Sequence, residues 1–528
     1  QFRTYCTAQT RTAAHAKFDY KPAPAHKLTW YGGYMDMKEQ QVRDMADDKS
    51  GSTRLRYTHQ YIFSTTLQGT HHFGSSGLEL EWKGAYSKAL SETPDQAEFN
   101  FIGTHIANTG SATRRWEHND DRDLAGHLDL RYSHGLMTYS VGGMYRDKKR
   151  GSFFNEYTFD STTGTANPQY RGEDWNNFNE LKLKPRPYGN IGDPLNYDAT
   201  EQIGAAYAMA KAKGKRWDAT VGLRAEHTVQ GYTLIFPRDS DPDGEQRYTD
   251  ILPSAHFKYE IHPKGRLHLS YNRSVNRPSF FEIVPYTIIN EDYKEKGNPD
   301  LEHTVADNID LRYEFFPKGS EQVMVGLFYK HLHNPIEYGL INEGQDTYYK
   351  PMNLGNATNA GVEIDVMKYF KCFGVKANYT FTHSRITTSK RTMQGSEVIS
   401  VNQSRPLFGQ AAHVANVSLL YKSSRWHWEG QISYGYTGKR LSDISNWLDD
   451  DIWEKGYHRL DLSLEKGFPK AGITLFAKAS NLLDTPVVRI VGRGDHTATV
   501  DTPRDNGYVI ERKEWHGQSF MLGLRWKL

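Results

Sequence analysis

The sequence predicts an all-β fold, a transmembrane antiparallel up-and-down β-barrel. Apolar and polar residues alternate in runs of about ten, which is the length of a barrel strand. Short and long connections alternate between these runs. Mean hydropathy over the 528 residues is only −0.73. No stretch approaches the ~18 consecutive apolar residues of a membrane helix, whereas a barrel strand needs apolar residues on one face only.

The C-terminal run shows the repeating unit. Every second side chain is apolar: Phe520, Leu522, Leu524, Trp526 and Leu528. The residues between them are Met521, Gly523, Arg525 and Lys527. Side chains of a strand point alternately to its two faces, so this run has one apolar and one more polar face. A lipid-facing Arg or Lys would cost about 2–4 kcal/mol, so the charged faces should line a polar interior, either a channel or a lumen filled by another element.

Nine hairpins follow from turn residues at their tips and from strand-like runs on either side. The paired runs are 11–21 with 28–37, 54–70 with 78–88, 122–134 with 136–147, 197–212 with 215–231, 248–261 with 266–275, 303–316 with 321–333, 358–370 with 373–385, 411–422 with 425–437, and 457–466 with 472–481. With the C-terminal run, we expect about nineteen strands, whereas bacterial barrels have even numbers.

Long connections separate the hairpins. They span 38–53, 89–121, 148–196, 232–247, 276–302, 334–357, 386–410, 438–456 and 482–515. Outer-membrane barrels have short turns on the periplasmic side and long loops outside, whereas compact soluble domains seldom carry so many long loops. The long connections are therefore expected to be extracellular, and the protein to lie in a bacterial outer membrane among lipid and lipopolysaccharide.

Composition narrows the function classes. Lys and Arg total 65 against 63 Asp and Glu, so there is no basic excess of the kind that nucleic acid binding requires. Aromatic residues make up 13% of the chain, which suits the girdles at the membrane interfaces. Cys6 and Cys372 should lie at opposite membrane faces, too far apart to bridge, so both should be free. We expect no cofactor.

We expect one barrel domain over residues 1–528. Gln1 begins directly in polar sequence without a signal peptide, although a barrel needs export. The odd strand count also implies that at least one upward strand precedes Gln1. The sequence is therefore expected to be a mature form or a piece of something longer.

Three motifs in order resemble the barrel of TonB-dependent outer-membrane receptors, most closely the type common in Bacteroidetes. They are NRPSFFEIVPY (276–286) with KGNPDLEHTVADNIDLRYEF (296–315), NLGNATNAGVEIDV (353–366), and SNLLDTP (480–486). The resemblance covers essentially the whole chain and is most specific over 270–528. His303 and Thr304 stand where the family usually has Pro-Glu.

The resemblance implies a 22-strand barrel around an N-terminal plug, on which TonB acts. Neither the plug, a TonB box nor about three of the strands is found in this sequence. The resemblance implies import of a scarce large solute, such as a siderophore, haem, glycan or peptide. A surface lipoprotein lid is a further implied partner. The alternatives are a plugless structural or assembly barrel in a larger outer-membrane complex, and a passive pore.

Candidate ligand-binding residues lie in the long connections. Arg277 and Asn298 could contact a ligand, although we favour backbone roles for both. The aromatic residues Phe280, Phe281, Tyr286, Tyr348 and Tyr349 could stack on a ligand, or else anchor the interface or pack within loops. Selectivity usually resides in such loops.

Other motifs could suggest adhesion or metal binding, but we favour interpretations that involve neither. Arg493-Gly494-Asp495 is interpreted as a chance tripeptide. His71-His72 and the pair His331 and His333 are interpreted as interface or loop histidines, and the acidic group 443 and 449–451 as a solvated loop without calcium. We expect no metal site. The sequence contains no nucleophile elbow, zinc-protease motif or P-loop, so we do not expect the protein to be an enzyme.

Overall fold

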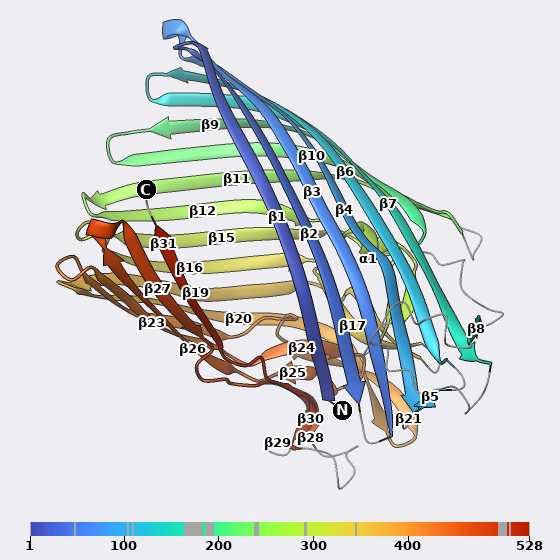
Figure 1. Cartoon of the computed structure of the whole chain (residues 1–528). Helices are drawn as coiled ribbons and strands as arrows, with labels where there is room; N and C mark the ends of the chain where they lie inside the picture. The colour runs from blue at the N-terminus through green and yellow to red at the C-terminus, as the bar shows by residue number, and fades with distance from the viewer. Residues whose placement is uncertain are drawn as a thin grey trace. The chain divides into compact units, whose positions relative to one another are not determined.

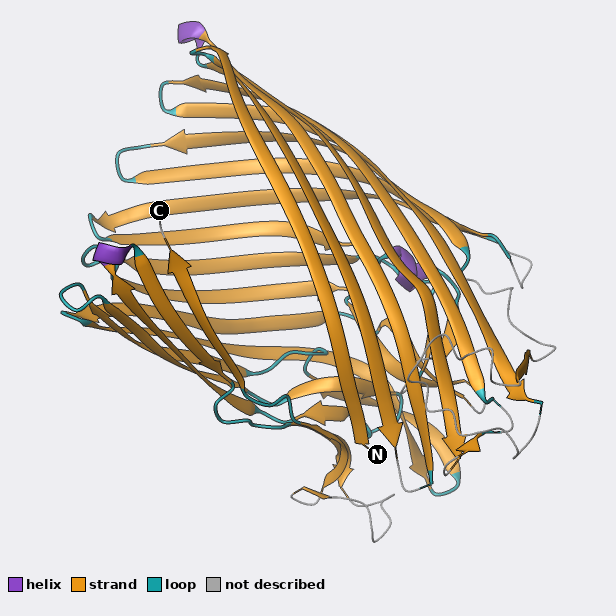
Figure 2. Ribbon diagram, viewed as in Figure 1, coloured by secondary structure: helices purple, strands orange, loops and turns teal. Residues whose placement is uncertain are grey.

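The computed structural model describes residues 2–46, 49–102, 105–107, 110–162, 183–185, 195–236, 242–289, 293–343, 346–494, 504–505 and 508–526. These residues are almost entirely β-structure (Figure 2). No helix among them is long and apolar enough to cross a membrane. The helical pieces are α1 (Phe280–Ile283) and the 3-10 turns η1 (Gly74–Ser76) and η4 (Pro469–Ala471).

Within the described part of the chain, twenty-two strands form the larger sheet, and nineteen of them correspond to the predicted runs (Figure 1). Those nineteen are β1 (Phe2–Ala23), β2 (His26–Ala46), β3 (Ser50–Phe73), β4 (Leu78–Ile102), β6 (Ala112–His134), β7 (Met137–Ser161), β9 (Tyr197–Lys213), β10 (Trp217–Leu234), β11 (Asp243–His262), β12 (Gly265–Asn276), β15 (Thr304–Phe315), β16 (Gln322–His333), β19 (Ala357–Phe370), β20 (Phe373–Gln394), β22 (His413–Ser423), β23 (Trp428–Thr437), β26 (Tyr457–Phe468), β27 (Ile473–Ser480) and β31 (Ser519–Trp526). The other three are β5 (His105–Ile106), β8 (Leu183–Pro185) and β21 (Glu397–Arg405).

The predicted antiparallel barrel sheet is confirmed, and so are its short turns. Pairs such as β11–β12 and β15–β16 are antiparallel and close at 262–265 and 315–323. The tip of the β3–β4 hairpin depends on a glycine. Gly77 has φ +72°, and a Cβ there would meet the carbonyl oxygen of Ser133. Cys6 and Cys372 are both free, as predicted.

Four long connections were predicted too long. Strand β2 continues to Ala46, β4 to Ile102, β7 to Ser161 and β20 to Gln394, so much of 38–53, 89–121 and 386–410 and the first part of 148–196 are strand. The alternation of apolar with polar residues fades in these extensions because both faces carry polar side chains there. Backbone pairing continues without it: Gln41 in β2 is opposite both Thr7 in β1 and Arg56 in β3.

Four other long connections contribute to a second sheet that the sequence did not predict, with nine strands among the described residues. Its strands in spatial order are β13 (Thr287–Ile289), β14 (Lys294–Lys296), β18 (Asp346–Asn353), β17 (Ile336–Glu343), β24 (Arg440–Ser445), β25 (Ile452–Glu454), β28 (Val487–Gly494), β30 (Tyr508–Glu514) and β29 (Arg504–Asp505). Two of its pairings, β14–β18 and β17–β24, are parallel. Asp495 and residues 527–528 lie outside the described residues.

The chain forms two compact units. Unit 1 comprises Gln1–Ala210, Leu223–Ile251 and Val284–Thr287, and its hydrophobic core cluster is Leu55, Ala97, Phe99 and Ala112. Unit 2 comprises Lys211–Gly222, Leu252–Ile283 and Ile288–Leu528, with a cluster of Ala357, Ile386 and Leu407. In each unit the alternation separates an apolar face from a polar face. In unit 1, for example, the apolar face of β6 exposes Leu124, Leu128 and Leu130.

Candidate functional site

A pocket of about 360 Å³ lies in unit 2 at the ends of β12, β15 and β16 that are far from their short turns. Its lining is mostly apolar with a few hydroxyl and amide groups, and consists of Ser274, Val275, Asn276, Thr304, Ala306, Leu332, Pro335, Ile336, Glu337, Leu407 and Phe408. Pockets of this size and character hold small molecules or parts of larger ones. We call it the strand-end pocket.

A buried ion pair forms one side of the strand-end pocket. The two terminal nitrogens of Arg405 donate to the two carboxylate oxygens of Glu337, at 3.1 and 2.9 Å. Their side chains are only 2% and 3% exposed. The backbone N–H of Phe408 donates to Glu337 at 2.7 Å, and Arg405 also donates to the Pro406 carbonyl at 3.0 Å. The planar guanidinium matches a carboxylate with two parallel hydrogen bonds, which fixes β17 against the end of β21.

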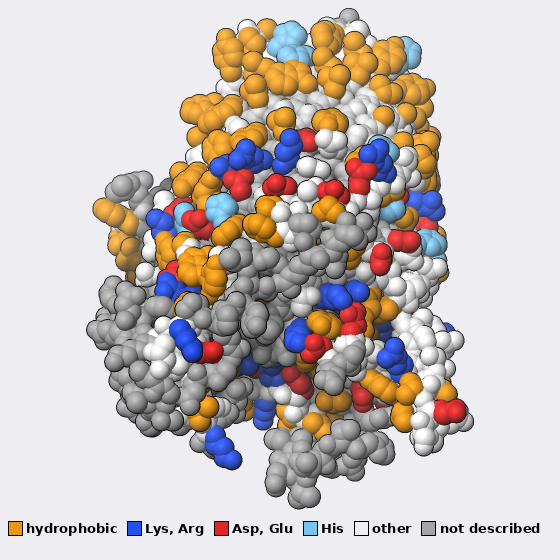
Figure 3. All heavy atoms as spheres, turned by 90° about the vertical axis from the view of Figure 1, so that its right-hand side faces the viewer, with side chains coloured by type: hydrophobic (Ala, Val, Ile, Leu, Met, Phe, Trp, Pro, Cys, Tyr) orange, Lys and Arg blue, Asp and Glu red, His pale blue; other side chains and the backbone are white. Residues whose placement is uncertain are grey.

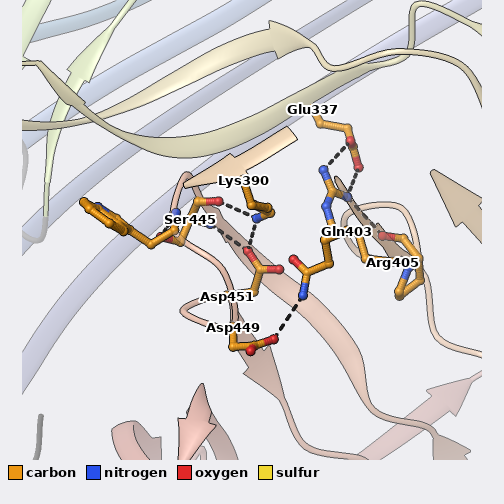
Figure 4. A network of polar contacts seen from close by, with 9 residues as sticks. Glu337, Lys390, Gln403, Arg405, Ser445, Asp449 and Asp451 are labelled. Atoms are coloured by element: carbon orange, nitrogen blue, oxygen red, sulfur yellow. Dashed lines mark hydrogen bonds and ion pairs between the residues drawn. The ribbon is translucent and has the colours of Figure 1, made fainter. Parts of the chain in front are cut away.

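A second buried pair lies close by (Figure 4). Lys390 in β20 meets Asp451 at 2.6 Å, with side chains 1% and 3% exposed. The Ser445 N–H donates to Asp451 at 2.8 Å, and Lys390 donates to the Ser445 carbonyl. Burial lowers the pKa of Lys390, and Asp451 acts in the opposite direction. Gln403 donates to Asp449 at 3.2 Å, so the hairpin of β20 and β21 is fastened to the segment after β24.

The prediction of a solvated loop is wrong for part of the acidic group 443 and 449–451, because Asp443 and Asp451 are only 6% and 2% exposed. Asp451 neutralises Lys390, Asp449 accepts from Gln403, and Asp443 pairs with Arg489. Among the described residues no three His, Cys, Asp or Glu side chains converge as a metal site would require.

The histidine motifs also have local partners. His71 lies 3.1 Å from His26 and accepts from the Trp82 indole N–H, and His72 is 3.1 Å from Glu79. The His331 and His333 rings lie 4.5 Å apart. The carboxylate of Asp307 lies 3.8 Å from His333.

Tyr349 belongs to an aromatic ladder in unit 2. Its ring stacks on Tyr338 at 5.1 Å and on Tyr293 at 6.4 Å between centroids. The Tyr338 hydroxyl donates to Glu282 in α1 at 2.9 Å. Burial raises the pKa of Tyr349 to about 12, and it also raises the pKa of Tyr338. Both phenols therefore stay protonated at neutral pH and present neutral rings.

Tyr348, its neighbour in sequence, belongs to a different environment because successive side chains of β18 point to opposite faces. The ammonium groups of Lys294 and Lys296 lie 6.0 and 5.2 Å from its ring centroid. Lys294 also pairs with Asp346, and Lys296 with Glu343, each at 2.6 Å. These hydrogen bonds lower the pKa of both carboxyl groups.

The remaining predicted residues lie at or near α1. Phe280 and Tyr286 are 3% and 1% exposed, and Phe281 is half-buried. Arg277 is half-buried directly after β12. Asn298 donates from its side chain to the Pro351 carbonyl at 2.9 Å and from its backbone to the Glu282 carbonyl at 2.7 Å. Asn298 thereby connects α1 to β18, which agrees with the favoured backbone role.

Sequence reasoning missed Glu282, Glu337, Lys390 and Arg405. Glu282 had a signal, because Ser279-x-x-Glu282 is a capping box: the Ser279 N–H donates to Glu282 at 2.7 Å and the Glu282 N–H donates to the Ser279 hydroxyl at 3.3 Å. The two buried ion pairs had no sequence signal, because Lys390 is 61 residues from Asp451 and Arg405 is 68 residues from Glu337.

A second, polar hollow of about 290 Å³ lies on the polar face of β20, β22, β23 and β26. We call it the polar wall; its lining is Lys376, Asn378, Asn416, Ser418, Gln431, Ser433, Tyr434, Gly435, Arg459 and Asp461. Short side chains here bond to one another, as Asn416 does to Asn378 at 2.9 Å and Ser418 to Ser433 at 2.8 Å. Their remaining donors and acceptors can serve water or a passing polar molecule.

A family model described as "Outer membrane protein beta-barrel family" matches residues 71–526. No curated protein sequence matches the chain. Solved structures with a similar fold include the siderophore receptor PiuA from Acinetobacter baumannii, with 12% identity and a TM-score of 0.58 over 98% of this chain and 80% of that one. The ferric yersiniabactin uptake receptor FyuA from Yersinia pestis has 12% identity and a TM-score of 0.57, covering 99% and 79%. The copper transporter OprC has 11% identity and a TM-score of 0.62, covering 99% and 79%.

Proposed function

Because the chain belongs to the outer membrane protein β-barrel family, we propose that it is the barrel of a TonB-dependent receptor that imports a scarce large solute. The strand-end pocket carries this proposal. It lies at the strand ends opposite the short turns, which in such barrels is the extracellular side. The similar folds of a siderophore receptor and a copper transporter support the same class of function.

The polar wall supports the passage of a hydrophilic solute. It offers amide, hydroxyl and paired charged groups on the face that a barrel turns inward. A solute leaving the strand-end pocket would exchange its hydrogen bonds with water for equivalent bonds along such a wall. The proposed energy source is TonB, acting on a plug within the complete receptor. A surface lipoprotein lid would fit the same scheme.

Uptake in cells tests the proposal. The native full-length protein is assayed with a labelled siderophore, haem, glycan and peptide, with and without TonB. We expect uptake of one of these classes, and loss of that uptake without TonB. Uptake that is unaffected by loss of TonB would overturn the proposal. Stable co-purification with partners and no uptake would favour the structural barrel instead.

A pocket-blocking variant tests the site itself. Ala306 lines the strand-end pocket, so Ala306→Trp should fill it and abolish uptake while leaving the protein in the outer membrane. The matched control is Ile309→Trp, because Ile309 lies on the same strand but is 46% exposed on the apolar face. Equal uptake by the two variants would contradict a role for the pocket. An intact mass of the native protein well above 60.5 kDa would support a plug.

A further inference from the structure

Three cations lie in one row across the strands of unit 1. Lys88 of β4 is directly opposite Arg122 of β6, and Arg122 is directly opposite Lys149 of β7. Directly paired residues of neighbouring strands point to the same face, and like charges in such pairs destabilise a sheet. The row therefore needs negative charge from another source. We call these three residues the cation row.

The acids nearby only partly meet this need. Asp120 lies between two of the cations, 3.4 Å from Lys88 and 3.2 Å from Arg122. Asp147 lies 3.7 Å from Lys149 and also accepts from Gln202. Within ion-pair distance the row thus has three positive charges against two negative ones. The side chains of Arg122 and Lys149 remain 62% and 63% exposed, so both can take an additional anion.

Three further acids lie on this face. Asp198 of β9 lies beside Gly151, and the other two have other partners. Asp36 and Glu92 both accept from the ring of His59, at 2.6 and 2.9 Å, and Glu92 also contacts His118 at 3.2 Å. These carboxylates are therefore engaged away from the cation row.

The cation row borders the apolar face. In the direction of the short turns, the same face of β4, β6 and β7 carries exposed apolar side chains: Tyr86, Leu124, Leu128, Leu130, Tyr139, Val141 and Tyr145. On β4 this surface runs from Leu78 to Tyr86, on the order of 27 Å along the strand, which suits the apolar band of an outer-membrane barrel. Figure 3 shows the same order, with hydrophobic side chains toward one end and then a zone of mixed basic and acidic side chains.

We propose that the cation row binds the phosphate groups of lipopolysaccharide in the outer leaflet. The row lies at the end of the apolar band away from the short turns, where the headgroups of that leaflet meet the protein. Arg122 presents planar donors that fit phosphate oxygens, and the two lysines supply point charges beside it. Acyl chains would lie on Leu124 and Leu128 below the phosphates. This inference depends on the outer-membrane location of the chain and not on transport.

Lipid retention tests the proposal. The full chain is purified from outer membranes in detergent and offered diphosphorylated lipid A, its monophosphorylated form or phosphatidylglycerol, and bound lipid is counted by native mass spectrometry. We expect diphosphorylated lipid A to be retained most strongly. The double variant Arg122→Gln/Lys149→Gln should weaken its retention by about 10-fold or more, as expected for the loss of charge-assisted contacts.

The matched control removes two exposed lysines near short turns, Lys422→Gln and Lys470→Gln, and should retain lipid A like the wild type. Heat-modifiable migration on gels shows that each variant is folded. Unchanged retention by the Arg122→Gln/Lys149→Gln variant would overturn the proposal. Equal retention of phosphatidylglycerol and lipid A would also overturn it, since that result would mean general attraction to anionic lipid. Neither result depends on solute uptake.

Discussion

At Arg405 a guanidinium group lies almost wholly out of water, and its charge is tolerated because Glu337 accepts two hydrogen bonds from it. Removing one member of such a pair leaves the other charged and buried. Arg405→Ala should therefore lower the free energy of unfolding by about 3–5 kcal/mol. Replacing both residues by apolar ones of similar volume, Arg405→Met with Glu337→Leu, should cost less, about 1.5–3 kcal/mol, because the hydrogen bond from the Phe408 N–H is then lost but no charge stays buried alone. Denaturant unfolding followed by tryptophan fluorescence measures both.

An exposed pair provides the control for this comparison. Lys422 and Glu429 are 2.6 Å apart but 67% and 54% exposed, so Lys422→Ala should change the free energy of unfolding by less than about 1 kcal/mol. A loss for Arg405→Ala as small as this would show that the buried pair adds little. A double variant as unstable as Arg405→Ala would show that shape and not charge dominates there.

The hydroxyl of Tyr338 holds the aromatic ladder to α1 through Glu282. Tyr338→Phe keeps the stacking on Tyr349 but removes a hydrogen bond to a carboxylate, which should cost about 1.5–3 kcal/mol locally. Hydrogen exchange over α1 and β17 should report this as faster opening. Tyr348→Phe is the control, because its hydroxyl meets the 44% exposed side chain of Asp346 at 3.2 Å and its loss should cost less than about 0.5 kcal/mol. Equal effects in the two variants would contradict the role of Glu282.

At the scale of the element, β17 and β18 form a hairpin whose stability should depend on pH. Hydrogen bonds from lysines hold the pKa of Glu343 and Asp346 below their ordinary values of 4.5 and 3.8. A carboxyl group with a lowered pKa stabilises the folded state fully above its unfolded pKa, and this contribution is lost as pH falls through the folded pKa. Protection of the hairpin amides should thus be constant from about pH 5 to 8 and fall below about pH 4.

Hydrogen exchange corrected for its intrinsic pH dependence measures that protection. The variant Glu343→Gln/Asp346→Asn should remove most of the change below pH 4, because neither side chain titrates. A hairpin that loses protection equally in the variant and the wild type would place the acid-sensitive groups elsewhere.

Prediction from sequence succeeded for strands in which apolar and polar residues alternate, and it failed for strands without this alternation. Strands such as β15 and β16 were placed to within about two residues, because one face meets lipid and the other does not. Hairpin tips such as Gly77 also have a local signal. The strands of the second sheet are mostly short, and two pairings are parallel between distant segments, so no period of two marks them. Of the strands of the second sheet only β17 lines the strand-end pocket, and Glu337 in it is 68 residues from its partner Arg405, so no local pattern marked this site.

At the scale of the whole molecule, the two faces of each strand should differ in the substitutions that they tolerate. A charged residue should be harmful on the exposed apolar face and tolerated on the polar face. Leu128 is 56% exposed on the apolar face of β6, and His127 points to the other face. Leu128→Arg should cost about 2–4 kcal/mol in the bilayer and reduce the amount of protein that assembles in the outer membrane. His127→Arg should assemble close to the wild-type level. Quantifying heat-modifiable protein in outer-membrane fractions measures this, and equal assembly of both variants would contradict contact of Leu128 with lipid.

The pair of Lys390 and Asp451 also bears on how the outer segments of such a protein can change over generations. Each residue is tolerated in the interior only while the other is present, although 61 positions separate them. A single replacement at either position leaves a lone charge behind, so lineages should replace the two together or keep both. Exposed neighbouring positions can then change independently, whereas these two positions should change only together. The segment after β24 and the β20–β21 hairpin should therefore be inherited as a matched set when loops are exchanged between relatives.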